Sequence, residues 1–140
     1  MTIALSTAAL DFSLRRDQHL AYASYAGAGY SWLRANGDGA LFAVTIDGQR
    51  HTSATLDLSA VDFDYATAGV QHLIARFTGS GFEVDHHLKV YADTALTESW
   101  QVVRCTGENP ITITRIDSFA LDIPAGAYAL HYYTSDWGAE

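Results

Sequence analysis

Asp85, His86 and His87 are three adjacent residues whose side chains can bind a metal ion or transfer a proton. They lie in the run FEVDHHLKVYAD, residues 82–93, in which apolar and polar residues alternate. Successive side chains of a β-strand point to opposite faces, so two adjacent histidines cannot reach one ion. We therefore predict no metal site here. His86 should point to the core with the apolar residues of the run, and His87 to the opposite face.

Asp62 and Asp64 are a second candidate, because two carboxylates on one strand face could act as an acid and a base. They alternate with apolar residues in the run VDFDYAT, residues 61–67. Cleavage of a glycosidic bond also needs one carboxyl group with a raised pKa across a cleft from its partner. The sequence indicates no such group, and a solvated strand face accounts for both aspartates.

Cys105 is the only cysteine, so the chain cannot form an intrachain disulfide. It follows a strand-like run and has no local signature of a catalytic nucleophile. The sequence also contains no Gly-rich phosphate loop, no C-x-x-C and no G-x-S-x-G. We predict no catalytic residue in this chain, no metal and no cofactor.

Aromatic side chains are the remaining candidates, because the faces of Tyr and Trp rings can stack against sugar rings. Tyr30, Trp32 and Arg34 take alternate positions just before the turn-like ANGDG, residues 35–39. If a strand ends there, the three side chains share one face, and we treat them as candidates for a substrate rim. The alternative for these rings is ordinary packing in the core or between domains.

A second group of aromatic residues crowds the run YALHYYTSDWGAE, residues 128–140. Large exposed rings favour contact with another surface. We predict that Tyr132, Trp137 and Glu140 lie on a seam between this domain and a following part of a larger enzyme.

The composition describes one globular domain, residues 1–140, that is large enough for a core. Hydrophobic residues make up 49% and charged residues 17%, as in ordinary folded chains. Eight Lys and Arg against 16 Asp and Glu give a net charge of −8, which disfavours partners such as nucleic acid or anionic membranes. No apolar run approaches the roughly 20 residues that cross a bilayer, and the start lacks the basic segment of a signal peptide. We expect a cytoplasmic protein.

Alternation with a period of two dominates the chain and predicts half-buried antiparallel strands. It is clearest in the runs 10–14, 61–67 and 82–93, and less one-sided in 40–47, 70–77 and 96–105. No segment of useful length carries a helical stripe of apolar residues, so we expect no helix longer than about two turns.

Turn signals separate these runs at 35–39, 78–81 and 106–110. We expect 47–55 to be a loop. Arg115 and Asp117 interrupt an apolar alternation in 111–123, which predicts a β-bulge or register change near 115–117. Eight or nine such strands predict an all-β fold, an antiparallel β-sandwich.

The last third of the sequence resembles the N-terminal domain of the family 36 α-galactosidases. The resemblance rests on Arg104, Asn109, Ser118, Asp122, Pro124 and the stretch Trp137, Gly138 and Glu140. It implies a β-supersandwich of the galactose mutarotase type. In that family the domain precedes a (β/α)8 barrel, which carries two catalytic Asp residues, a nucleophile and an acid/base. Neither has a counterpart in this sequence.

The resemblance therefore implies a non-catalytic N-terminal domain that supports a downstream catalytic barrel and helps to assemble a homo-oligomer. The substrate of the whole enzyme would be an α-galactoside or another carbohydrate. Many members extend a long loop to an active site, whereas residues 30–57 are compact here. Two alternatives are a free-standing carbohydrate-binding module and a small sugar epimerase, which would need a His acid and a Glu base in one cleft.

Overall fold

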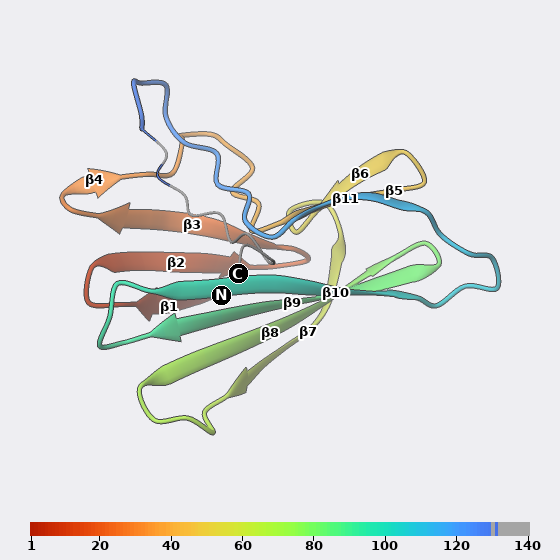
Figure 1. The fold of residues 1–140 in the computed structure, drawn as a ribbon, viewed down its shortest axis with the longest axis horizontal. Helices are drawn as coiled ribbons and strands as arrows, with labels where there is room; N and C mark the ends of the chain where they lie inside the picture. Colours follow the sequence, from red (N-terminus) through yellow and green to blue (C-terminus); the bar gives the residue numbers. More distant parts are fainter. Residues whose placement is uncertain (130, 132–140) are drawn as a thin grey trace, which may run out of the picture.

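The computed structural model describes residues 1–129 and 131, and this part of the chain contains eleven β-strands and no helix (Figure 1). The strands are β1 (Thr2–Ser6), β2 (Leu10–Arg16), β3 (Leu20–Gly27), β4 (Tyr30–Ser31), β5 (Ala43–Ile46), β6 (Gln49–Thr52), β7 (Asp57–Asp64), β8 (Val70–Gly79), β9 (Phe82–Tyr91), β10 (Thr97–Cys105) and β11 (Ile113–Asp117). With no helix described, nothing in this part is a candidate for a membrane-spanning helix.

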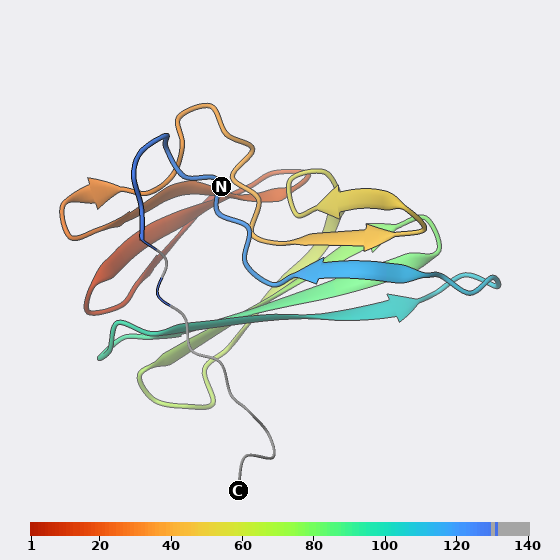
Figure 2. The same ribbon diagram turned by 45° about the horizontal axis from the view of Figure 1, so that its top comes forward.

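The strands form three antiparallel sheets, with the orders β1-β2-β3-β4, β10-β9-β8-β7 and β11-β5-β6. The four long strands β7–β10 make one layer, and the other two sheets lie side by side over it (Figures 1 and 2). This arrangement confirms the predicted antiparallel β-sandwich.

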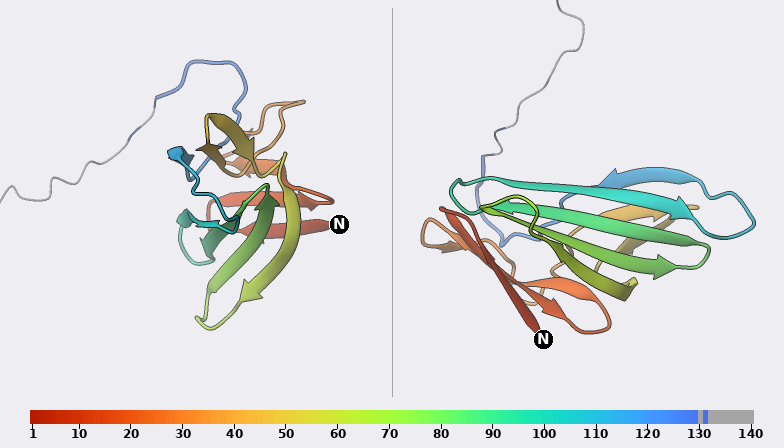
Figure 3. Two further views of the ribbon diagram at one scale, coloured as in Figure 1. Left: turned by 90° about the vertical axis from the view of Figure 1, so that its right-hand side faces the viewer. Right: turned by 90° about the horizontal axis from the view of Figure 1, so that it is seen from below.

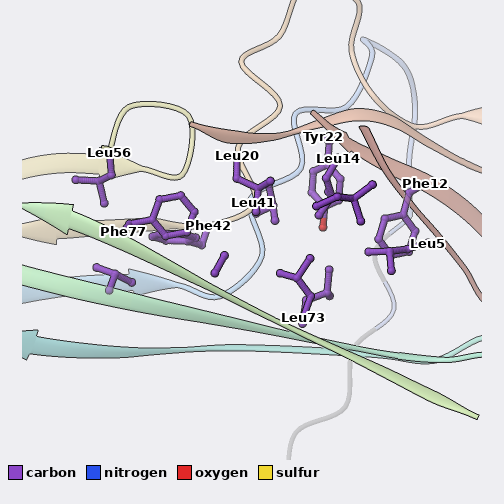
Figure 4. Packing of buried hydrophobic residues seen from close by; sticks show 14 of the residues in the cluster. Leu5, Phe12, Leu14, Leu20, Tyr22, Leu41, Phe42, Leu56, Leu73 and Phe77 are labelled. Atoms are coloured by element: carbon purple, nitrogen blue, oxygen red, sulfur yellow. The ribbon is translucent and has the colours of Figure 1, made fainter. Parts of the chain in front are cut away.

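The core lies between the layers, where the alternating apolar residues of each strand meet (Figure 4). Leu73 and Phe77 of β8 are fully buried, as is Val84 of β9. The ring of Phe77 meets that of Phe42 edge to face, with centroids 5.2 Å apart. The predicted inward faces of the runs 10–14, 61–67 and 82–93 are the faces that pack here, except at Tyr65, which follows the end of β7 and is exposed.

Apart from the two-residue β4, three strands lie outside the predicted runs, namely β1, β3 and β6. The expectation of a loop over 47–55 was wrong, because β6 pairs with β5 in a tight hairpin. Its two-residue turn, Asp47 and Gly48, has left-handed φ values of 51° and 79°. An Asp-Gly pair is favoured at such a turn, so the signal for this hairpin was present in the sequence.

The sandwich is closed at one edge and open at the other. At the closed edge β6 leads into β7 through residues 53–56, where Leu56 is buried. At the other edge β10 and β11 lie together (Figure 3). Ile113 and Ile116 pair with the buried Ile46 and Val44 but are themselves 41% and 46% exposed. Apolar side chains are therefore exposed at the edge formed by β10 and β11.

The predicted irregularity in the last run is present, as a register shift between Ile113 and Arg115. The shift brings Ile116 opposite Val44, whereas Ile113 lies opposite Ile46, two residues along β5. Both isoleucines consequently face the same side of the sheet, which strict alternation would not allow.

Candidate functional site

An open hollow of about 720 Å³ lies beside β6 and β11. The loop that follows β4 forms one wall, and the segment that follows β11 forms another. The polar and aromatic side chains around it are Asn36, Asp38, Arg50, Arg115, Asp117, Phe119 and Asp122. The residues that line the hollow come from parts of the sequence that are far apart, from Asn36 to Asp122.

Arg34 and Asp122 tie the two walls together. The backbone N–H of Arg34 donates to the carbonyl of Asp122 at 2.7 Å, and the guanidinium lies 3.6 Å from the Asp122 carboxylate. Gly37 permits this approach, because a Cβ atom at that position would lie 2.8 Å from Oδ2 of Asp122. The walls are thus held by one main-chain bond and one partly exposed ion pair.

Gly39 fixes the same loop against the core. Its φ of 66° is in the left-handed region, and its carbonyl accepts a 2.7 Å bond from the N–H of Tyr22. A side chain there would place a Cβ atom 2.5 Å from the Tyr22 carbonyl oxygen, so only glycine fits without a shift of the backbone. Asp38 braces the turn by accepting a bond from the N–H of Ala40 at 3.1 Å.

The chemistry of the hollow suits binding of a polar, uncharged molecule. Arg115 forms an ion pair with Asp117, with Nε to carboxylate distances of 2.8 and 3.0 Å. The ring of Phe119 is half exposed beside these groups. Carboxylates accept, guanidinium groups donate, and an aromatic face offers apolar contact, which together fit a ligand rich in hydroxyl groups.

The rim candidates are divided between two places. Tyr30 and Trp32 pack together with ring centroids 5.8 Å apart, and Tyr128 continues the row at 6.3 Å from Trp32. Trp32 is half-buried, and its indole N–H donates to the carbonyl of Gly27 at 3.2 Å. Because β4 ends at residue 31, strand alternation does not reach Arg34, which instead pairs with Asp122 of the hollow. Their role at a substrate rim stays a prediction.

Tyr132, Trp137 and Glu140 lie outside the described residues, so their place on a seam also stays a prediction. The described residues that precede them contain a concentration of exposed apolar side chains. These are Val102, Ile113, Ile116, Phe119, Ile123 and Tyr128.

His86 and His87 point to opposite faces, as the alternation predicts. His86 is buried beneath Phe42, whose ring stacks on the imidazole at 5.1 Å, and its Nδ1 accepts a 2.9 Å bond from Gln101. Its Nε2 has no hydrogen-bond partner among the described residues. Burial lowers the pKa of His86 to about 3, so the ring is neutral at ordinary pH. His87 instead lies on the outer face, bonded to His72.

The carboxylates near these histidines have structural contacts. Asp62 and Asp64 share the outer face of β7, as predicted, and Asp64 lies 3.8 Å from Nδ1 of His72. Asp85 is buried between Arg76 at 2.8 Å and Arg104 at 2.5 Å. The bond from Arg76 lowers the pKa of Asp85, against the opposing effect of burial, so this carboxylate stays ionised.

Cys105 is exposed, and its thiol lies 3.2 Å from the carbonyl of Asn109. Of the residues that the structure describes, no three His, Cys, Asp or Glu side chains are grouped to hold a metal ion.

Sequence reasoning missed most of the hollow. None of the residues that line it is among the predicted site residues, although Asp122 is one of those that carry the family resemblance and the rim candidate Arg34 pairs with it. Arg115 and Asp117 were a usable signal, because two charged residues interrupt an otherwise apolar run at that point.

The described residues form an antiparallel β-sandwich domain with a polar hollow beside β6 and β11 and an open edge at β10 and β11. Residues 33–140 match the profile of the glycosyl hydrolase family 36 N-terminal domain. The chain therefore belongs to this family, as the resemblance of its last third indicated. The match begins after β4, so the whole first sheet, β1–β4, lies outside it. No curated protein and no solved structure matches the chain.

Proposed function

We propose that this chain is the non-catalytic N-terminal domain of an α-galactosidase-like glycoside hydrolase and that it supports a (β/α)8 catalytic barrel. Family membership supports the glycoside hydrolase context. The observation that carries the proposal is the open edge between β10 and β11, where the apolar side chains of Ile113 and Ile116 are exposed. A surface of this kind favours a permanent contact with further polypeptide of the same enzyme.

The backbone of the open edge also supports a contact with further polypeptide. β10 and β11 each pair with one neighbouring strand only, so the outer side of each offers N–H and C=O groups for pairing. Ser99 and Gln101 of β10 donate to the carbonyl of Ser118, just after β11, and hold the two sheets at this edge. The edge is thus fixed in shape before a partner binds.

The exposed apolar residues beside the edge extend the contact surface. Ile123 and Tyr128 continue it beyond Phe119, toward Trp32. A contact between domains of one chain buries about 600–1,500 Å². We propose that the barrel covers this edge, and that the domain also contributes to a homo-oligomer.

A second candidate function, binding of a carbohydrate by the domain itself, is favoured by the hollow. Its carboxylates and guanidinium groups suit the hydroxyl groups of a sugar, and Phe119 offers a ring face. In the whole enzyme the hollow would then lie near the entrance to the active site, with an α-galactoside as the class of ligand.

The proposal is tested by association between the chain and the catalytic region encoded with it. Residues 1–140 alone should not hydrolyse an aryl α-galactoside, and the catalytic region should bind them. Phe119→Ser should weaken this association by about tenfold or more, as expected for an aromatic residue within an interface. The matched control is Tyr65→Ser, which removes an exposed ring beside β7 at the far edge and should have no effect.

Two results would count against the proposal. A coding sequence without a barrel that bears two strand-end Asp residues would remove the proposed partner. A second contrary result would be saturable binding of galactose by residues 1–140 that is lost in Phe119→Ser and is unchanged when the catalytic region is added. This result would favour the binding module.

A further inference from the structure

His72 and His87 form a hydrogen-bonded pair on the outer face of the sheet β7–β10, away from the hollow. Nε2 of His72 on β8 lies 3.0 Å from Nδ1 of His87 on β9. Trp100 of β10 stacks on His87, with centroids 4.7 Å apart and planes within 5°. Nothing in the proposed function uses this group.

The distance between the two nitrogens limits the number of protons on the pair. A bond between them needs one nitrogen to carry hydrogen and the other to accept it. The carboxylate of Asp64 lies 3.8 Å from Nδ1 of His72 and favours a proton there. Nε2 of His72 is then the acceptor, and Nδ1–H of His87 is the donor.

We propose that the His72–His87 pair is a proton-controlled link between β8 and β9. It holds with two or three ring protons, because one hydrogen still lies between the two facing nitrogens when three are bound. A fourth proton puts a hydrogen on both facing nitrogens. The bond is then lost, and two positive charges face each other.

The charged groups around the pair set the pH at which it opens. They are Asp62 and Asp64 on β7, Arg76 on β8, Asp85 and Lys89 on β9, and Glu98 and Arg104 on β10. Burial lowers the pKa of His87, and a charge on His72 lowers it further. Lys89 and Arg104 act in the same direction, and Asp85 acts in the opposite one. The link is therefore intact at neutral pH and opens in acid.

Opening of the link changes the surface around Trp100. His87 covers one face of the indole, and the ammonium of Lys89 lies 5.5 Å from its centroid. Separation of His87 from His72 leaves a charged imidazole against the indole face. Acid thereby changes the environment of the Trp100 ring on the outer side of the sheet.

The test is nuclear magnetic resonance of the ring nitrogens in the full chain, labelled with ¹⁵N at histidine, between pH 8 and pH 4. At pH 8 we expect His87 to carry its hydrogen on Nδ1. Its titration midpoint should lie below 6.5 and rise by about half a unit or more in His72→Phe, which removes the neighbouring charge. The indole N–H signal of Trp100 should move with the same midpoint.

The control is His51→Asn, which changes a histidine on β6 and should leave His87 and Trp100 unaffected. His72→Gln replaces His72→Phe if the latter does not fold, and far-UV circular dichroism at each pH confirms that the sandwich persists. A midpoint of His87 that is identical with and without His72 would overturn the proposal, as would a hydrogen on Nε2 of His87 at pH 8.

Discussion

His86→Asp is expected to destabilise the domain by about 2–4 kcal/mol, because it places an unpaired charge in the core. His86 is 1% exposed and is sandwiched against Phe42. The substitution would also remove Nδ1 of His86, the atom that accepts a hydrogen bond from the side-chain amide of Gln101. Chemical denaturation at pH 7.5 measures the loss as a lower midpoint with an unchanged slope.

The same substitution at the next residue provides the matched control. His87 is only half-buried on the outer face, so His87→Asp loses one hydrogen bond and should cost about 1 kcal/mol. Equal losses at the two positions would show that the two histidines do not face opposite sides of the sheet.

Acid should destabilise the wild-type domain by about 5 kcal/mol through His86 alone. The pKa of His86 is about 3 in the folded state against 6.5 as the ordinary value. Below pH 6.5 the unfolded chain binds a proton that the folded chain does not, so the free energy of unfolding falls as the pH decreases to about 3. The two pKa values differ by about 3.5 units, and each unit corresponds to about 1.36 kcal/mol, which together give the loss of about 5 kcal/mol.

His86→Phe isolates this contribution, because it keeps a ring against Phe42 and cannot titrate. The free energy of unfolding of the variant should depend less steeply on pH between 6.5 and 3, by the amount stated. His86→Leu serves the same purpose if the larger ring does not fit. Parallel pH profiles for wild type and variant would mean that His86 is not buried in its neutral form.

The strands that could be predicted from sequence are those with one buried and one exposed face. In β9 the residues on either side of His86 in the alternation, Val84 and Leu88, are apolar. This pattern alone predicted the directions of His86 and His87. In β3 the pattern fails, because a register shift opposite Ser13 and Leu14 breaks the period of two. Small residues also make up much of that strand and give little contrast between its faces.

The hollow was harder to predict, because it depends on the path of the chain between sheets. Asp38 and Asp122 come from loops, where no periodicity reports which side chains meet. Arg34 illustrates the limit, since its predicted face assumed a strand that ends three residues earlier. The two loops are joined by main-chain hydrogen bonds, which do not depend on residue type and so cannot be predicted from the sequence.

Hydrogen exchange on the complex between residues 1–140 and the catalytic region tests the central claim most directly. Our account predicts slower exchange at the amides of β10 and β11, where new polypeptide would cover the open edge. The amides of β7 and β1, at other edges of the sandwich, should exchange as in the free chain. Protection confined to β7 or β1, or absent from β10 and β11, would contradict the assignment of the open edge as the surface that supports the enzyme.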